Sequence, residues 1–208
     1  MRTASRWACV AAAALAAASC GDVVRQGRAP TYLVINTLLA APGNKPAAFG
    51  GTLLSDVITN VTTPAPCTTS TPCPTVFNDV GQAVLTLQLK DLGTPGNPAT
   101  GTPTNSVTIN RVHVAYRRTD GRNTPGVDVP YAFDGAVTGT VAVSGTLTLG
   151  FEIVRHITKQ EPPLVQLVNS ATVITTLADV TFYGRDQAGN DVSVTGTIQI
   201  DFGNFGDT

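Results

Sequence analysis

The sequence has few of the residues that usually carry enzymatic chemistry. Among its 208 residues are only two histidines, His113 and His156, and charged residues make up 13% of the chain. A Gly-x-Ser-x-Gly nucleophile motif, phosphate-binding loops and dinucleotide fingerprints are all absent. Glycoside hydrolysis needs two placed carboxylates, but most aspartates here fall in turn contexts such as Asp120-Gly121, where they cap their own backbone. We therefore expect no enzymatic activity, no catalytic residue and no cofactor.

Long hydrophobic runs are also missing. The longest, residues 7–18, is about a dozen residues, whereas a helix needs roughly 20 to span a bilayer. Two arginines precede this run, and small residues follow it up to Cys20. A basic start, a short apolar segment and small residues together indicate an N-terminal export signal.

The end of this segment, Ala17-Ala18-Ser19-Cys20, resembles the lipobox of bacterial lipoprotein signal peptides. The resemblance implies that residues 1–19 are removed and that Cys20 carries the lipid, such as palmitate. It departs from the family pattern at Ala17, where leucine is commonest. Gly21 follows the cysteine where the best-known inner-membrane sorting signal has aspartate, which favours the outer membrane over the inner. The alternative is cleavage by the general signal peptidase, which would give a soluble periplasmic or secreted protein.

Each of the four cysteines can be assigned a role that is consistent with an exported lipoprotein. Cys9 lies inside the predicted signal, Cys20 takes the lipid, and Cys67 and Cys73 remain as a pair. In an oxidising compartment such a pair indicates a disulfide, and the stretch "PCTTSTPCP" is rich in turn residues. A structural zinc site needs four ligands, and neither histidine is near in the sequence, so we expect no metal here.

The charge of the mature chain is slightly negative. Without residues 1–19, 11 basic residues face 14 acidic ones, a net of −3, which argues against nucleic acid as a partner. One segment is nevertheless basic, and we call its side chains the basic stripe: Arg111, His113, Arg117, Arg118 and Arg122. The stripe is a candidate surface for an anionic glycan, a lipid head group or an acidic protein. The alternative is a solvated strand face whose cations pair with neighbouring carboxylates.

Alternation of apolar and polar residues recurs along the chain and predicts strands. It is clearest in residues 81–91 and 191–202, and we also expect strands at residues 32–39 and 52–61. The pattern slips by one residue near Asn110 and Arg111, which predicts a β-bulge there. A single short helix is expected within residues 158–170. Asp186, Asn190 and Asp191 match no calcium-loop spacing, so we interpret their segment as a hairpin turn.

These patterns predict an all-β protein, an antiparallel β-sandwich of about 8–9 strands with at most one short helix. The closing stretch "VTFYGRDQAGNDVSVTG" resembles the final hairpin of bacterial immunoglobulin-like domains, which implies an immunoglobulin-like sandwich. We expect a flexible tether at residues 20–30 and one sandwich domain at residues 31–208. Within that domain, the Pro- and Gly-rich residues 91–106 are predicted to form a long loop.

The sequence thus predicts a non-enzymatic lipoprotein of the bacterial envelope, held on the membrane through Cys20 and serving as an interaction or structural module. Its partner would be an envelope protein or a glycan. A carbohydrate-binding surface lipoprotein is the alternative function, because sandwiches present flat faces to glycans. Stacking on sugars would then fall to three tyrosines: Tyr116, Tyr131 and Tyr183.

Overall fold

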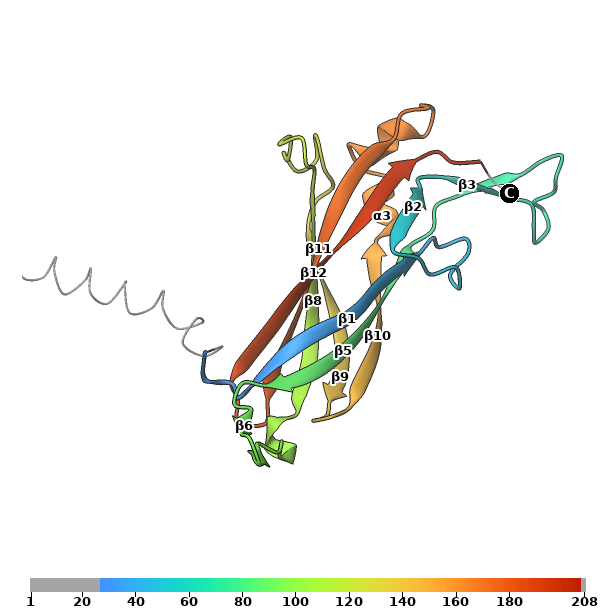
Figure 1. The fold of residues 1–208 in the computed structure, drawn as a ribbon. Helices are drawn as coiled ribbons and strands as arrows, with labels where there is room; N and C mark the ends of the chain where they lie inside the picture. Colours follow the sequence, from blue (N-terminus) through green and yellow to red (C-terminus); the bar gives the residue numbers. More distant parts are fainter. Residues whose placement is uncertain (1–26, 207–208) are drawn as a thin grey trace, which may run out of the picture.

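A computed structural model of the protein describes residues 27–206, and its body is two β-sheets packed face to face (Figure 1). The smaller sheet has the order β1-β5-β10, with β1 (Thr31–Ala41), β5 (Asp79–Leu89) and β10 (Thr146–Val154). The larger sheet has the order β2-β12-β11-β8-β9, with β2 (Thr52–Asp56), β8 (Val107–Arg117), β9 (Phe133–Val141), β11 (Ile174–Asp186) and β12 (Asp191–Gly203). The predicted all-β sandwich is confirmed.

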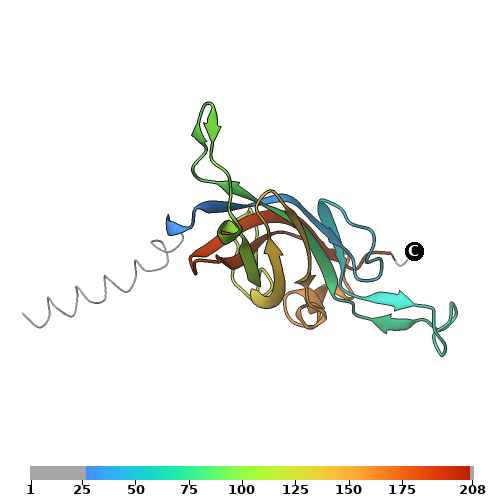
Figure 2. The ribbon, with the colours of Figure 1, turned by 90° about the horizontal axis from the view of Figure 1, so that it is seen from below.

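Two small hairpins extend from this body. One pairs β3 (Thr59–Val61) with β4 (Cys73–Thr75), and we call residues 59–75 the arm. The other pairs β6 (Gly93–Thr94) with β7 (Asn97–Pro98), followed by the 3-10 turn η1 (Pro103–Asn105), within the predicted long loop. Figure 2 shows both hairpins projecting from opposite ends of the sandwich.

The helical content differs from the prediction. The single helix expected within residues 158–170 is replaced by two one-turn pieces, α3 (His156–Lys159) and the 3-10 turn η2 (Leu164–Leu167). Pro162 and Pro163 lie between them, and a proline has no backbone N–H to continue a helical ladder. No helix in residues 27–206 has the length and apolar character needed to cross a membrane.

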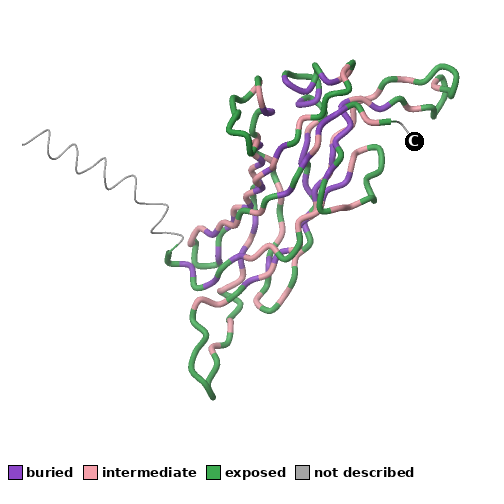
Figure 3. The backbone as a smooth tube through the Cα atoms, turned by 45° about the horizontal axis from the view of Figure 1, so that its top comes forward, coloured by how far each residue is buried: buried purple, intermediate pink, exposed green. Residues whose placement is uncertain are grey.

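The core lies between the sheets and follows the alternation in the sequence. In β5, Ala83 and Leu85 are completely buried, as are Val180 and Phe182 in β11. The ring of Phe151 in β10 meets that of Phe182 edge to face at 5.3 Å, which joins the two sheets. Figure 3 shows buried positions alternating with less buried ones along the strands, while both hairpins are largely exposed.

The predicted bulge is present in β8. Against β11, Ile109 and Arg111 pair with the consecutive residues Gly184 and Tyr183, so Asn110 is the extra residue there. The register against β9 shifts at the same place. Ile109 is buried, while Asn110 and Arg111 are both exposed. Opposite the bulge, a Cβ on Gly184 would lie 2.5 Å from the Thr108 carbonyl oxygen, so the close approach of the two strands requires glycine.

The strand expected at residues 52–61 is wrong as a single element. β2 pairs with β12, and the pairing is parallel, which departs from the predicted all-antiparallel arrangement. The chain turns after Asp56, whose carboxylate accepts hydrogen bonds from Thr59 Oγ1 at 3.0 Å and from the backbone N–H of Phe205 at 3.2 Å. This buried acid ends β2, and β3 then starts the arm.

The sandwich has two distinct ends. Thr31 pairs with Leu89 and Ala41 with Val80, so β1 and β5 run side by side over eleven residues, about 34 Å. We call the end that holds residues 27–30 and the β6–β7 hairpin the entry end. The far end, opposite, holds the arm, α3, η2 and the loop of residues 118–132 (Figure 1).

Candidate functional site

The predicted lipidation site, Cys20, lies outside the described residues. From Gly27 onward the chain is fixed to the entry end: the Pro30 carbonyl accepts a hydrogen bond from the Lys90 N–H at 2.9 Å. Lys90 Nζ also donates to the Gly27 carbonyl at 3.4 Å, and Ala29 is buried. The last residues of the predicted tether are therefore attached to the end of β5.

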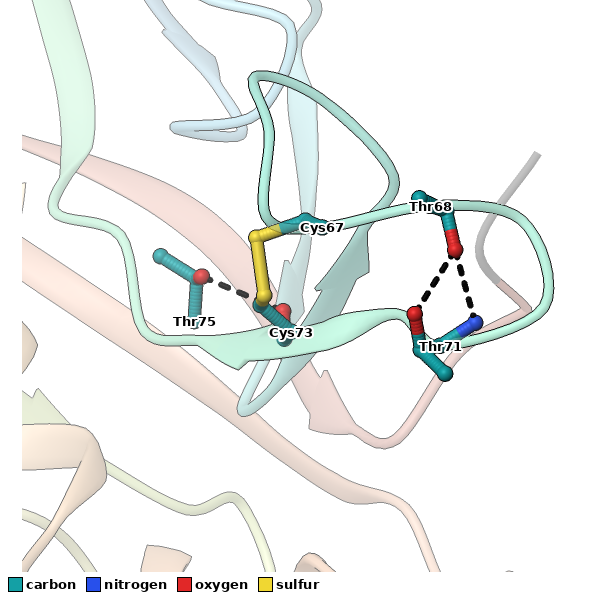
Figure 4. Close-up of a disulfide and its surroundings, with 5 residues drawn as sticks. All are labelled: Cys67, Thr68, Thr71, Cys73 and Thr75. Carbon is teal, nitrogen blue, oxygen red and sulfur yellow. Dashed lines mark hydrogen bonds between the residues drawn. A yellow bond between two sulfur atoms is a disulfide. The ribbon is translucent and has the colours of Figure 1, made fainter.

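The arm carries the predicted disulfide, which is confirmed between Cys67 and Cys73, with Cα atoms 5.4 Å apart. Figure 4 shows the loop that it closes, where Thr68 Oγ1 lies 2.7 Å from Thr71 Oγ1 and accepts the Thr71 N–H at 3.0 Å. Residues 59–78 include no charged side chain, and most of the loop is exposed. The arm is thus an uncharged, stapled projection of the far end.

A buried ion pair lies beside the base of the arm. Lys159 Nζ is 2.9 Å from both carboxylate oxygens of Asp79, and each side chain is only 1% exposed. The same Nζ donates to the Asp56 carbonyl at 2.9 Å, while Ser55 Oγ and the Gly43 N–H donate to Asp79 at 2.6 and 2.9 Å. We call these five residues the far-end lock. It joins β2, β5, α3 and the loop after β1.

Burial raises the pKa of the Asp79 carboxyl, against the opposing effects of the Lys159 charge and the hydrogen bonds from Ser55, Lys159 and Gly43. The sequence alone does not reveal this cluster. Lys159 lies in a segment expected to be helical, and Asp79 lies two residues before the alternating strand predicted at residues 81–91. No local pattern links two residues that are 80 positions apart.

Three members of the basic stripe lie on the outer face of the larger sheet, and each has a carboxylate partner. Asp134 on β9 accepts from Arg111 at 3.3 Å and lies 3.2 Å from His113 Nδ1. Arg117 binds Asp179 on β11 at 2.7 Å. Partial burial raises the pKa of Asp179. The hydrogen bonds from Arg117 and Thr197 and the positive charge of Arg117 together lower this pKa by more, so the net shift is downward.

The other two members, Arg118 and Arg122, belong to the loop after β8 and share Asp120, at 2.6 and 3.2 Å. The hydrogen bond from Arg118, above all, lowers the pKa of the Asp120 carboxyl. The structure therefore divides the stripe into separate ion pairs on two elements. Binding of an anionic partner stays a prediction, but the positive charges are compensated locally.

The bulge creates a recess of about 310 Å³ on the same outer face. There the Arg111 guanidinium stacks on the Tyr183 ring at 3.9 Å, and Arg185 pairs with Asp191 at 2.6 Å. Asp186, at the end of β11, accepts the N–H groups of Ala188 and Asn190 and so caps the hairpin turn. Within residues 27–206, metal-ligating side chains do not gather in groups of three or more.

The three tyrosines proposed for sugar stacking differ in how far their rings are exposed. Tyr116 is buried and donates its hydroxyl to the Ile153 carbonyl at 2.7 Å, because the bulge places it on the inward-facing side of β8. Burial also raises the pKa of its hydroxyl. Tyr183 lies beneath Arg111, so Tyr131 is the one of the three with a largely exposed ring.

Most of the exposed large apolar side chains lie at the far end, although Tyr32 and Leu92 are exposed at the entry end. Tyr131 is 56% exposed, and its ring packs against Gly126, where a Cβ would lie 2.4 Å from the phenolic oxygen and where φ is +75°. Three further segments of this end each expose large apolar side chains, namely α3, η2 and the residue before β11: Ile157, Val165 and Val173. Val127, in the same loop as Tyr131, is 66% exposed.

The far end therefore combines a stapled uncharged arm, a buried lock and several exposed apolar side chains, whereas the outer face of the larger sheet carries compensated ion pairs. These features come from segments widely separated in the sequence. The chain matches no protein-family model, and neither the curated proteins nor the solved structures contain a match to it.

Proposed function

We propose that the protein is a non-enzymatic lipoprotein of the bacterial envelope, anchored by lipid at Cys20 and presenting its far end to a protein partner. The observation that carries this proposal is the separation of the two ends. The described chain begins at the entry end, whereas the arm and most of the exposed large apolar side chains lie about 34 Å away, at the other end of β1 and β5. Gly21 favours the outer membrane as the site of the anchor.

The short link to the anchor supports this orientation. If the mature chain starts at Cys20, only seven residues, 20–26, link the anchor to Gly27. Even fully extended, these residues would reach at most about 25 Å. The entry end would therefore stay close to the bilayer. The far end would extend beyond it by the length of the sandwich, where a partner can reach it.

The environments of the histidines support a non-enzymatic role. His113 lies beside Asp134 on a solvated strand face, and the His156 ring lies 2.9 Å from the Asn78 side chain. Both contacts are of the kind that hold strand and loop residues in place. The buried lock is likewise enclosed within the fold, away from any substrate.

The anchor is tested with radiolabelled palmitate and membrane fractionation of the full chain. We expect the native chain to incorporate label and to sediment with membranes, and we expect Cys20→Ala to abolish labelling and move the protein into the soluble fraction. Cys9→Ala is the matched control, because Cys9 lies inside the predicted signal. A Cys20→Ala protein that still carries label and sediments with membranes would contradict the proposed anchor.

A further inference from the structure

The far-end lock places an amine against a carboxyl group in a water-excluded site. Lys159 Nζ contacts both oxygens of Asp79 at 2.9 Å, and neither side chain is more than 1% exposed. Burying two charges carries a desolvation cost that the pair must offset. Transfer of one proton from the ammonium to the carboxylate removes both charges, and it leaves a neutral amine beside a neutral carboxylic acid.

The carboxyl group is also polarised from both sides. The Gly43 N–H donates to Oδ1 at 2.9 Å, and the Ser55 hydroxyl donates to Oδ2 at 2.6 Å. A backbone N–H on one oxygen is placed to stabilise negative charge that develops there during attack on the carbon. The hydroxyl on the other oxygen can pass a proton to it. Burial raises the pKa of Asp79, which favours the protonated form that can lose its oxygen as water.

We propose that Lys159 and Asp79 are joined by an intramolecular amide bond, formed between Nζ and Cγ with loss of one water molecule. The lone pair of the neutral amine attacks Cγ, and the electron pair of the C=O bond moves to Oδ1. When the C=O bond re-forms, the Cγ–Oδ2 bond breaks. Oδ2 leaves as water with two protons that came from the ammonium, the second passed through Ser55. Ammonium and carboxylate thus give amide and water, without oxidant or other co-reactant.

The third proton of the former ammonium stays on the nitrogen as the amide N–H. Nζ already donates to the Asp56 carbonyl at 2.9 Å, so this N–H has its acceptor in place. The bond would connect α3 to the start of β5 across 80 residues of sequence. It would fix the far end covalently, and it does not depend on lipid at Cys20.

The bond is tested by tryptic peptide mass spectrometry of the full chain purified from the envelope, with the disulfide reduced. Trypsin cleaves after Arg155 and, if Lys159 is free, after Lys159, releasing residues 156–159 and 160–185. Asp79 lies in the peptide 29–90, because Lys45 precedes a proline. We expect instead one branched product for most of the protein, in which residues 156–185 are attached to residues 29–90. Its mass should be one water molecule below the sum of the two peptides.

The matched control is Lys159→Arg, which keeps a cation beside Asp79 but has no amine to form the bond. The branched product should disappear in this variant, and cleavage after position 159 should return. Recovery of residues 156–159 and 160–185 as the main products of the native chain would overturn the proposal. A branched product that persists in Lys159→Arg would overturn it as well.

Discussion

The two ends of the sandwich differ in where their polar contacts lie. At the far end, Lys159 and Asp79 form a buried pair within a cluster that four segments share. At the entry end, the β6–β7 hairpin is exposed, and its Asp91 carboxylate simply accepts the Gly93 N–H at 2.8 Å. A buried partner that loses its counterpart has no water to replace it, whereas an exposed one does. The far end should therefore be sensitive to single polar changes that the entry end tolerates.

Lys159→Met should produce the largest effect, because it removes the buried partner of the Asp79 side chain, whether the two are held as an ion pair or by the proposed amide bond. We expect the free energy of unfolding to fall by about 3–5 kcal/mol in chemical denaturation. The matched change at the entry end, Lys90→Met, should cost about 0.5 kcal/mol or less. Similar losses in the two variants would remove the distinction between the ends.

Removal of the disulfide should have a smaller effect that is confined to the arm. The chain-entropy model gives about 2 kcal/mol for a loop of this length, and the Cys67→Ser, Cys73→Ser double variant should lose no more than that. Limited proteolysis should show faster cleavage within residues 59–75 and unchanged cleavage elsewhere. General loss of protease resistance would mean that the staple, rather than the buried lock, holds the far end.

The exposed pair of Arg117 and Asp179 should contribute least, so Arg117→Ala should lower the free energy of unfolding less than either of the far-end changes above. Its pH dependence has a definite sign. Because the folded-state pKa of Asp179 is lowered from 3.8, the pair stabilises the fold above that value, and the contribution disappears as the pH falls through the lowered pKa. Unfolding curves of the native chain and Arg117→Ala should differ at neutral pH and converge in acid. A difference that grows in acid would contradict this.

Local patterns in the sequence were sufficient to predict much of the sandwich. Alternation has a period of two residues, so the strand at residues 81–91 and the bulge at Asn110 could be recognised within a single stretch. The Cys67–Cys73 pair was similarly local. The strand at residues 52–61 was mispredicted, because its interruption depends on Asp56 contacting Phe205, which is 149 positions away.

The contacts of the candidate site residues could be predicted even less, because they join residues that are far apart in the sequence. The alternation of apolar and polar residues correctly placed His113 and Arg117 on an outward face. Their partners Asp134 and Asp179 lie on neighbouring strands, however, and spacing in the sequence does not reveal strand order. The lock needed the packing of β2, β5 and α3 to bring Lys159 to Asp79. Only the folded chain shows which isolated charged residues are buried together.

Photo-crosslinking of the membrane-bound full chain tests most directly whether the far end is the docking end. A benzophenone amino acid is introduced at Tyr131, in the far-end loop, and separately at Leu92, beside the entry-end hairpin; both positions are largely exposed. We predict a discrete protein adduct from position 131 and no protein adduct from position 92. Protein adducts from position 92 alone, or equally from both positions, would contradict the proposed orientation.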